Sequence, residues 1–314
     1  MTANLINRLS ETELASLLDG ARRLWESGQC CPTRCGVTRQ WGTAADREPP
    51  CCGSPVGIKV ASFAVHNGEE PPVSGWNGAG NVFFSGCNMH CIFCQNWPIS
   101  HDNNGRLYSS DEFAGEIKKL LAKKVHNLNL TTADHYLYPV LAALAGMRGD
   151  ITVPISYNCS GYFTAEALAL VIRFADIFLY DVKYLDPALA ARYSRAPGYV
   201  DAMTRGLDVI HAAKIPWEED DLGLLRRGLI IRHLVIPGAV DNSLKVLDLL
   251  ARHRDRGMVF KLSLMSQYFP AYRAVDHPEV GRRLTHDEYD PIVARMEELD
   301  LDGWMQDLDA HGGA

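Results

Sequence analysis

From residue 81 onward, short β-forming runs alternate with amphipathic helical stretches, and this alternation restricts the fold more than any other feature. The runs are rich in β-branched and aromatic residues, which predicts strands. They lie at 81–86, 127–132, 151–158, 176–184, 228–236 and 258–264. Strands that alternate with helices predict a parallel sheet with right-handed crossovers. Six such units are too few for a closed barrel of eight, so the expected fold is α/β, a partial (βα)6 TIM-like barrel.

The predicted helices lie before and between these strands. Residues 10–27 repeat apolar residues at helical spacing, after a capping box formed by Ser10 and Glu13. The pairs Ser109–Glu112 and Thr285–Glu288 mark two further helix starts in the same way. Other helices are expected at 134–147, 164–174, 200–213 and 242–254.

The chain divides into three parts on this pattern. Residues 1–80 comprise an N-terminal helix and an irregular extension, because residues 28–80 hold many Gly, Pro, Cys and Asn and show little periodicity. Residues 81–270 form the partial barrel, and residues 271–314 form a helical C-terminal tail. The length of 314 residues is near the upper limit for one hydrophobic core.

Composition and charge favour a soluble globular protein. Hydrophobic residues make up 47% of the chain, charged residues make up 22%, and the formal net charge is −7. This acidic balance argues against nucleic acid or an anionic membrane as a partner. The N-terminus lacks the pattern of a signal peptide, and no run reaches the roughly 18 apolar residues that span a bilayer. We therefore expect a cytoplasmic protein, whose clustered cysteines are metal ligands or catalytic groups rather than disulfides.

Three of the nine cysteines, Cys87, Cys91 and Cys94, fall within eight positions just after the first barrel strand. The carboxyl ends of parallel strands form the face where α/β folds bind ligands. A [4Fe–4S] cluster is normally held by four cysteines, so three leave one iron open to a small molecule. A zinc site with His90 as the fourth ligand is an alternative, although His90 adjoins Cys91 directly and gives an awkward bite for one tetrahedral ion. Three unrelated thiols are the remaining alternative.

The pattern Cys87-x3-Cys91-x-Phe93-Cys94 resembles the signature of the radical S-adenosylmethionine (SAM) superfamily, including the aromatic residue before the last cysteine. More narrowly, residues 81 to about 270 resemble the pyruvate formate-lyase activating enzyme group, in particular a homologue branch of it. The resemblance implies a partial (βα)6 barrel. It lies in the stretches HNGEEPPVSG (66–75), NVFFSGCNMHCIFCQN (81–96), HNLNLTTADHY (126–136), YNCSGY (157–162), LYDVKYLD (179–186) and IRHLVIPG (231–238).

The resemblance also implies a mechanism. The open iron would chelate the methionine end of SAM, and one electron from the reduced cluster would release methionine and a 5′-deoxyadenosyl radical that abstracts a substrate hydrogen. An electron donor such as flavodoxin or ferredoxin is implied, and a backbone glycine of a partner protein is the substrate by similarity to glycyl-radical activases. A small molecule or peptide substrate is one alternative. A non-catalytic iron–sulfur or zinc protein is the other.

Further residues at strand ends resemble the SAM site of the activating enzymes. Their Asp-x-Lys matches Asp181, Val182 and Lys183, where the lysine can neutralise a carboxylate and the aspartate can accept from an ammonium or hydroxyl group. A plain ion pair at the strand end is the alternative. By position, Asn158 and Ser156 are candidates for the ribose and Arg232 for a carboxylate; Gln267 and Tyr268 lie at the same face.

The stretch TTADHY at 131–136 departs from that family pattern. It replaces a Gly-Gly-Glu-like stretch whose backbone meets the SAM ammonium group. Thr131, Thr132 and Asp134 are candidates to hydrogen-bond that group, with helix capping as the alternative for Asp134. We expect His135 and Tyr136 to be core or rim residues.

A second group of cysteines precedes the barrel. Cys31-Pro-x-x-Cys35-Gly resembles a segment of the homologue branch in which another cysteine lies three residues earlier, a place held here by Gly28. Zinc or an auxiliary iron–sulfur cluster would be held by Cys31, Cys35 and Cys52, with Cys30 and Cys51 as further possible ligands. Reduced loop thiols are the alternative. Cys159 is expected to be a small packing residue.

Overall fold

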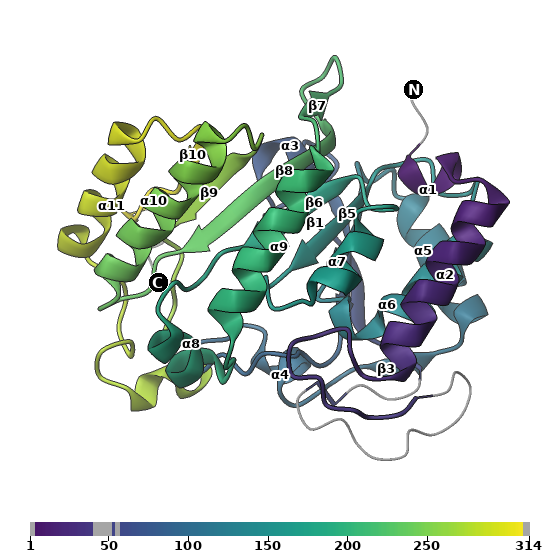
Figure 1. The fold of residues 1–314 in the computed structure, drawn as a ribbon, viewed down its shortest axis with the longest axis horizontal. Coiled ribbons are helices and arrows are strands. Elements are labelled where there is room, and N and C mark those ends of the chain that lie inside the picture. Colours follow the sequence, from purple (N-terminus) through teal and green to yellow (C-terminus); the bar gives the residue numbers. More distant parts are fainter. Residues whose placement is uncertain (1–3, 40–51, 54–56, 310–314) are drawn as a thin grey trace.

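The computed structural model describes residues 4–39, 52–53 and 57–309, so Cys51 lies outside the described residues. Its sheet runs in the order β10-β9-β8-β6-β5-β4-β2-β1-β3 (Figure 1). The six predicted barrel strands are confirmed, and each pairs in parallel with the next. They are β2 (Ala79–Phe84), β4 (Leu128–Thr131), β5 (Ile155–Cys159), β6 (Ile177–Asp181), β8 (Leu225–Leu234) and β9 (Lys261–Met265).

Four further strands were not predicted. β1 (Ile58–His66) pairs antiparallel with β2, and β3 (Arg106–Tyr108) pairs antiparallel with β1. β10 (Gly303–Met305) extends the parallel sheet beside β9, and β7 (Glu218–Glu219) forms a hairpin with β8 that projects at the top of Figure 1. β1 lies in the segment expected to be irregular, and that expectation is wrong there. A register shift between Val60 and Ser62 breaks the alternation of apolar and polar residues that marks a strand.

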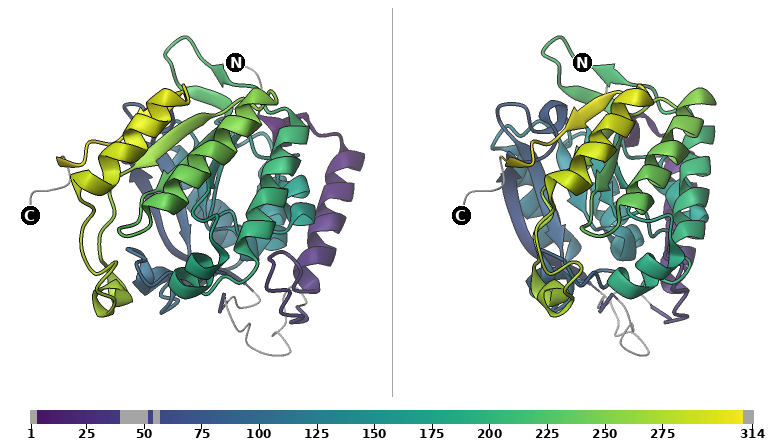
Figure 2. Two further views of the ribbon diagram at one scale, coloured as in Figure 1. Left: turned by 60° about the vertical axis from the view of Figure 1, so that its left-hand side comes forward. Right: turned by 90° about the vertical axis from the view of Figure 1, so that its left-hand side faces the viewer.

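The helices cover one face of the sheet, which we call the outer face (Figures 1 and 2). All three predicted capping boxes are confirmed. The longer helices are α2 (Glu11–Glu26), α5 (Ser110–Leu121), α6 (Leu137–Gly146), α7 (Ala165–Val171), α8 (Pro187–Ser194), α9 (Tyr199–Ala213), α10 (Val240–Asp255) and α11 (His286–Glu298). The shorter ones are α1 (Leu5–Arg8), α3 (Pro71–Ser74), α4 (Trp97–Ser100), η1 (Asp134–Tyr136) and η2 (Tyr272–Asp276). In the described part of the chain, no helix is long and apolar enough to cross a lipid bilayer.

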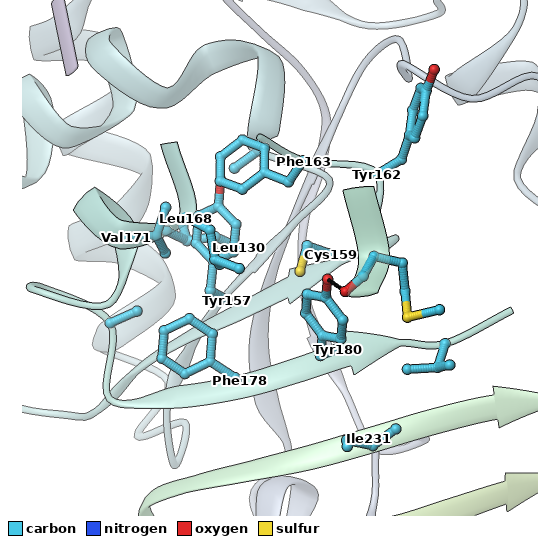
Figure 3. Close-up of a cluster of buried hydrophobic side chains, with 14 of the residues drawn as sticks. Leu130, Tyr157, Cys159, Tyr162, Phe163, Leu168, Val171, Phe178, Tyr180 and Ile231 are labelled. Carbon is cyan, nitrogen blue, oxygen red and sulfur yellow. Dashed lines mark hydrogen bonds between the residues drawn. The ribbon is translucent and has the colours of Figure 1, made fainter. Parts of the chain in front are cut away.

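The main hydrophobic core lies between the outer face and these helices. Every second residue of each strand joins it, as Figure 3 shows for Leu130, Tyr157, Phe178 and Ile231 on four neighbouring strands. Phe163, Leu168 and Val171 from the α7 region pack against them, and the hydroxyl of Tyr180 donates to the carbonyl oxygen of Met203 at 3.1 Å. The strands therefore present their alternate residues to the opposite, inner face.

The inner face has an apolar part and, nearer the carboxyl ends of the strands, a polar part. A second apolar cluster holds Val73, Ala79, Ile177, Leu179, Leu225 and Ile230. Nearer the carboxyl ends of the strands, the inward positions are occupied by Asn81, Asn129, Ser156, Asn158, Asp181, Arg232 and Ser263. Inner positions of such barrels are usually filled by bulky branched residues. The polar side chains found here instead make this region a candidate ligand-binding site.

Candidate functional site

The three cysteines of the motif lie in the loop between β2 and α4, at the carboxyl edge of the sheet. In Figure 1, α4 and α8 lie together at this lower edge. The loop is fixed to the last residues of α8 by backbone bonds: the amide of His90 donates to Ser194 O at 2.9 Å, and that of Ile92 donates to Tyr193 O at 2.8 Å. The side-chain amide of Asn88 donates to Tyr162 O at 2.6 Å. The loop is thus tied to two separate parts of the barrel rim.

Each sulfur of the motif has a hydrogen-bonding group of the protein beside it. The hydroxyl of Ser194 donates to Cys91 Sγ at 3.0 Å, and the amide of Met89 donates to Cys87 Sγ at 3.4 Å. Ser100 Oγ lies 3.1 Å from Cys94 Sγ. Donors of this kind stabilise thiolates and tune iron–sulfur clusters. The donor set therefore fits a cluster held by three cysteines. The sequence analysis missed Ser194 and Ser100, and Ser194 belongs to α8, a helix that was not predicted.

Burial keeps the thiols of Cys87 and Cys91 protonated when no metal is bound. It raises the pKa of Cys91 to about 11 and that of Cys87 well above its usual value. Metal binding removes the proton, because the thiolate is the ligand. In the described part of the chain, no three His, Cys, Asp or Glu side chains converge on a position for a single metal ion. A [4Fe–4S] cluster makes a different demand, because each thiolate binds a different iron at its periphery.

Gly86 allows the chain to turn from β2 into the cysteine loop. Its φ is +81°, and a Cβ placed there would lie 2.0 Å from the carbonyl oxygen of Cys52. The same position lies 3.3 Å from Nε2 of His135, whose ring bonds to Ser85 O at 2.8 Å. Only glycine fits a left-handed turn this close to another backbone. The N-terminal cysteine segment is therefore packed directly on the start of the motif loop.

Asp181 lies between two cations beside this loop. Its Oδ1 accepts from Arg232 Nε at 2.8 Å, and its Oδ2 accepts from the ammonium group of Lys183. Arg232 also donates to Asn158 Oδ1 at 2.5 Å. The structure thus brings together four residues that the sequence analysis assigned to SAM: Asn158, Asp181, Lys183 and Arg232.

These charges remain in place despite burial. Burial alone would raise the pKa of Asp181, but Arg232 and Lys183 hold it below its ordinary value. Burial would lower the pKa of Lys183, but Asp181 and then Cys91 raise it. Lys183 therefore stays an ammonium group whose charge is felt by Cys91. The ion pair and the cysteine loop form one connected site, which can offer a fixed cation and a fixed anion to a zwitterionic ligand.

The residues of the stretch 131–136 lie in two kinds of position: Thr131 is on the inner face of the sheet, and Asp134 and His135 are buried beyond the end of the strand. Thr131 ends β4 on the inner face, and its Oγ1 is buried without a hydrogen-bond partner among the described residues. Thr132 adopts a left-handed φ of +62°. Asp134 does not cap the following helix, since Ala133 is the N-cap and no side chain caps it. Burial raises the pKa of Asp134 to about 7, which identifies it as a buried carboxyl group rather than a surface cap. His135 is a buried core residue, as expected.

The other candidates have packing roles that the structure defines. Phe93 is buried against Tyr268, with ring centroids 5.6 Å apart, and the hydroxyl of Tyr268 donates to Val280 O at 2.7 Å. Gln267 accepts a bond from Gln95 through its carbonyl oxygen. Val182 is fully buried, its amide donates to Arg232 O, and its carbonyl accepts from His233. Val182 therefore sets Asp181 and Lys183 on the same side of the chain. Cys159 is buried in the main core, as expected of a packing residue.

The N-terminal cysteines gather around one small cavity. Cys30, Cys31, Cys35 and Cys52 all line it, together with Trp25, Gly28, Thr33, Arg39 and His135. Cys30 and Cys52 are buried, and a guanidinium nitrogen of Arg39 lies 3.9 Å from Cys52 Sγ. Gly28, where a cysteine stands in the resembling segment, has a φ of +66° and contributes only backbone. The structure thus brings together the three residues proposed for a second site.

Comparisons with known proteins show what this chain is similar to. The profile of the Radical SAM superfamily matches residues 81–251. An uncharacterised protein of Methanocaldococcus jannaschii is 28% identical over 292 residues, covering 90% of this chain and 78% of that protein. SuiB of Streptococcus suis, solved with its precursor peptide SuiA, has a TM-score of 0.47 and 7% identity over 72% of this chain and 48% of SuiB, so the chain spans about half the length of SuiB. A domain of pyruvate-formate lyase-activating enzyme from Bacteroides vulgatus has a TM-score of 0.35 and 13% identity, over 52% of this chain and 86% of that domain.

Proposed function

Because the chain belongs to the radical SAM superfamily, we propose that it cleaves SAM reductively at a [4Fe–4S] cluster held by Cys87, Cys91 and Cys94 and abstracts hydrogen from a substrate. When bound, the cluster and SAM supply a one-electron cleavage that yields methionine and a 5′-deoxyadenosyl radical. The observation that supports this most is the cysteine loop itself. Its three sulfurs each have a hydrogen-bonding group beside them, and the loop lies against a buried lysine.

The residues beside the loop would bind and orient SAM. Lys183 would pair with the carboxylate of SAM, and Asp181 would accept from its ammonium or ribose hydroxyl groups. Asn158 and Thr131 offer an amide and a hydroxyl group from neighbouring strands, and Arg232 fixes Asp181 in position. Phe93, buried against Tyr268, holds the loop close to the sheet and excludes water from its inner side.

The substrate that we favour is a backbone glycine of a partner protein, as in glycyl-radical activases. The stretches that resemble the activating enzymes support this choice, and they overlap β2, β4, β5, β6 and β8 of the barrel. A small molecule or a peptide is the second candidate, which the polar inner face favours because it offers side-chain hydrogen bonds inside the barrel. The superfamily needs a one-electron reductant, and flavodoxin or ferredoxin is the donor that we propose.

The first experiment is anaerobic. Protein reconstituted with iron and sulfide is mixed with dithionite and SAM, and 5′-deoxyadenosine is measured by chromatography. We expect the nucleoside to form with a full cluster present; none forming would favour a non-catalytic iron–sulfur or zinc protein. Electron paramagnetic resonance with candidate partner proteins then separates the substrates. A glycyl radical supports the activase, and its absence favours the small molecule or peptide.

We also propose that the cavity lined by Cys31, Cys35 and Cys52 holds a second metal group, an auxiliary iron–sulfur cluster, since the described side chains do not converge on a position for a single zinc ion. Four cysteines around one cavity offer the thiolates that such a cluster takes as ligands. Arg39, buried beside Cys52, would offset the negative charge that several thiolates bring. Because Cys52 packs on Gly86, a metal group bound at Cys52 would stabilise the start of the motif loop.

A further inference from the structure

The segment between β1 and β2 closes the amino end of the barrel. Val73 of α3 is fully buried in the second apolar cluster, and its carbonyl oxygen accepts from Asn127 Nδ2 at 2.7 Å. The hydroxyl of Ser74 bonds to the amide of Glu69 at 2.9 Å and stabilises the turn before the helix. This closure leaves Glu69 and Glu70 at the start of α3, with their side chains directed to the polar part of the inner face.

Glu69 is bound on the inner face by three side chains. Its Oε1 accepts from Asn81 Nδ2 at 2.8 Å and from Asn129 Nδ2 at 3.0 Å, and its Oε2 lies 3.5 Å from Arg232 Nη1. Only 8% of its side chain is exposed. A loop residue has therefore become part of the barrel interior, which the sequence analysis did not foresee although the stretch HNGEEPPVSG contains it.

Glu70 is the acid that has no such partners. Its carboxyl group lies beside Ser263, but its Oε2 is buried and has no hydrogen-bond partner among the described residues. In the same part of the chain, no cation lies within salt-bridge distance of it, whereas Asp181 and Glu69 share Arg232. Three carboxyl groups thus share two cations, Arg232 and Lys183; the charge of Arg232 acts on Glu70, but Glu70 makes no direct ion pair among the described residues.

Two neighbouring strands add further unused acceptors. Asn129 and Ser156 are paired in register and fully buried, and Asn129 Oδ1 and Ser156 Oγ have no partner among the described residues. A buried polar atom without a partner costs about 1–3 kcal/mol. The amide of Asn129 already contacts Glu69, so its free oxygen lies next to that glutamate. These oxygens can accept hydrogen bonds, and a carboxyl group without its own ion pair lies in the same interior. A ligand suited to them would donate hydrogen bonds and carry a positive charge.

We propose that Glu70, with Glu69 and Asn129, binds a protonated nitrogen of the substrate, an ammonium or guanidinium group. This inference rests on the proposed function, because it names the substrate class of the same site. Such a group offers several donors and a positive charge, and so satisfies the unused oxygens and the unpaired acid together. Burial raises the pKa of Glu70, and a bound cation would counter that rise.

The subsite at Glu70 lies next to the residues that we propose for SAM, so a substrate bound there would be close to them. Arg232 contacts Asp181 on one side, at 2.8 Å, and Glu69 on the other, at 3.5 Å. One guanidinium group therefore separates the residues proposed for SAM from those proposed for the substrate. A substrate anchored by its cation at Glu70 would extend toward the carboxyl edge, where hydrogen abstraction is proposed.

Ligand-observed saturation-transfer NMR on the cluster-reconstituted full chain tests the subsite without SAM. The probes are n-butylammonium, butan-1-ol and butyrate, which share a chain and differ in charge. We expect the ammonium probe to bind at least tenfold more tightly than the other two. Equal binding of butan-1-ol or butyrate would overturn the proposal.

Substitutions then assign the binding to Glu70. Glu70→Gln should weaken the ammonium probe at least tenfold and Glu70→Asp less, while Glu297→Gln, an exposed residue of α11, serves as the matched control. Unchanged binding in both Glu70 variants would refute the subsite. SAM cleavage by the native protein is measured in parallel. Failure to cleave SAM counts against the proposed function, whereas normal cleavage without ammonium selectivity counts only against this subsite.

Discussion

Arg232 joins two carboxylates that belong to different layers of the barrel: its guanidinium group lies 2.8 Å from Asp181 and 3.5 Å from Glu69. Asp181 ends β6 at the carboxyl edge, whereas Glu69 comes from the segment that closes the amino end. The same arginine therefore fixes the edge proposed for SAM and the interior proposed for the substrate. Lys183 contacts only Asp181 in this group, so it can be removed without breaking the link.

Lys183→Ala should weaken SAM binding while leaving the cluster intact. A buried hydrogen bond to a charged group contributes about 1.5–3 kcal/mol, which corresponds to a loss of affinity of roughly ten- to a hundredfold. Equilibrium dialysis with labelled SAM measures the affinity, and iron per chain checks the cluster. Lys245→Ala, on the exposed side of α10, is the matched control and should bind as the native protein does. Native affinity in Lys183→Ala would contradict the assignment.

Replacing any one motif cysteine should abolish SAM cleavage. Cys87→Ala, Cys91→Ala and Cys94→Ala each leave two thiolates, which cannot hold a cluster with one open iron. The assay is 5′-deoxyadenosine formation after anaerobic reconstitution. Cys159→Ala removes a buried thiol of the main core near the same edge and should retain cleavage. Cleavage by any of the three motif variants would refute its ligand role.

Gly86→Ala should disrupt the motif loop without touching a cysteine. A left-handed conformation costs a residue other than glycine about 1–2 kcal/mol, and the added Cβ would lie 2.0 Å from the carbonyl oxygen of Cys52. We expect a lower urea midpoint and less iron per chain after reconstitution. Gly146→Ala is the control, because a Cβ at this end of α6 meets nothing within 4 Å. Equal iron content in both variants would show that the loop accommodates the added Cβ at position 86 and still binds the cluster.

The barrel strands were predictable because their sequence signal is local. Each inner strand is a short apolar run between helices with clear caps, so spacing and capping boxes located it. β1 was missed because a bulge hides its alternation, and α8, which begins at a proline, was also missed.

The site was predictable where its residues are close in sequence or lie at the carboxyl ends of barrel strands, as Asn158 and Arg232 do. Cys87, Cys91 and Cys94 share one loop, and Asp181 and Lys183 share one strand end. The contacts of Ser194 with Cys91 and of Glu69 with Asn129 join residues 103 and 60 positions apart, and no local pattern encodes them. Such contacts follow from the tertiary arrangement of the sheet and its loops, which brings residues distant in sequence together.

Acid should destabilise the fold through two buried histidines. Burial lowers the pKa of His233 and of His135 to about 4, whereas an unfolded histidine titrates near 6.5. The unfolded chain therefore binds more protons at these two histidines between these values, and their contribution to the free energy of unfolding falls as the pH drops from about 6.5 to 4. The contribution of Asp134, whose pKa burial raises to about 7, has the opposite sign, so the histidine contribution is measured as a difference between variants. Each histidine contributes up to about 1.4 kcal/mol per pH unit.

The contribution of His233 can be isolated by substitution. Its ring lies 2.6 Å from Val182 O and 2.8 Å from Ser243 Oγ, contacts that a glutamine amide can replace in part. His233→Gln should remove about half of the slope contributed by the two histidines, measured by urea denaturation at several pH values. A slope equal to that of the native protein would mean that His233 does not titrate on unfolding.

Metal analysis decides whether the N-terminal cysteines hold a second group. The double variant Cys31→Ala, Cys35→Ala removes two of the four described thiols around the cavity and leaves the motif loop unchanged. We expect iron per chain to fall by the content of one site, with zinc measured alongside, by inductively coupled plasma mass spectrometry. SAM binding should persist, because Cys87, Cys91 and Cys94 remain. Cys159→Ala controls for the loss of a buried thiol. Iron and zinc contents equal to those of the native protein would leave these residues as reduced thiols that pack the N-terminal segment against Gly86.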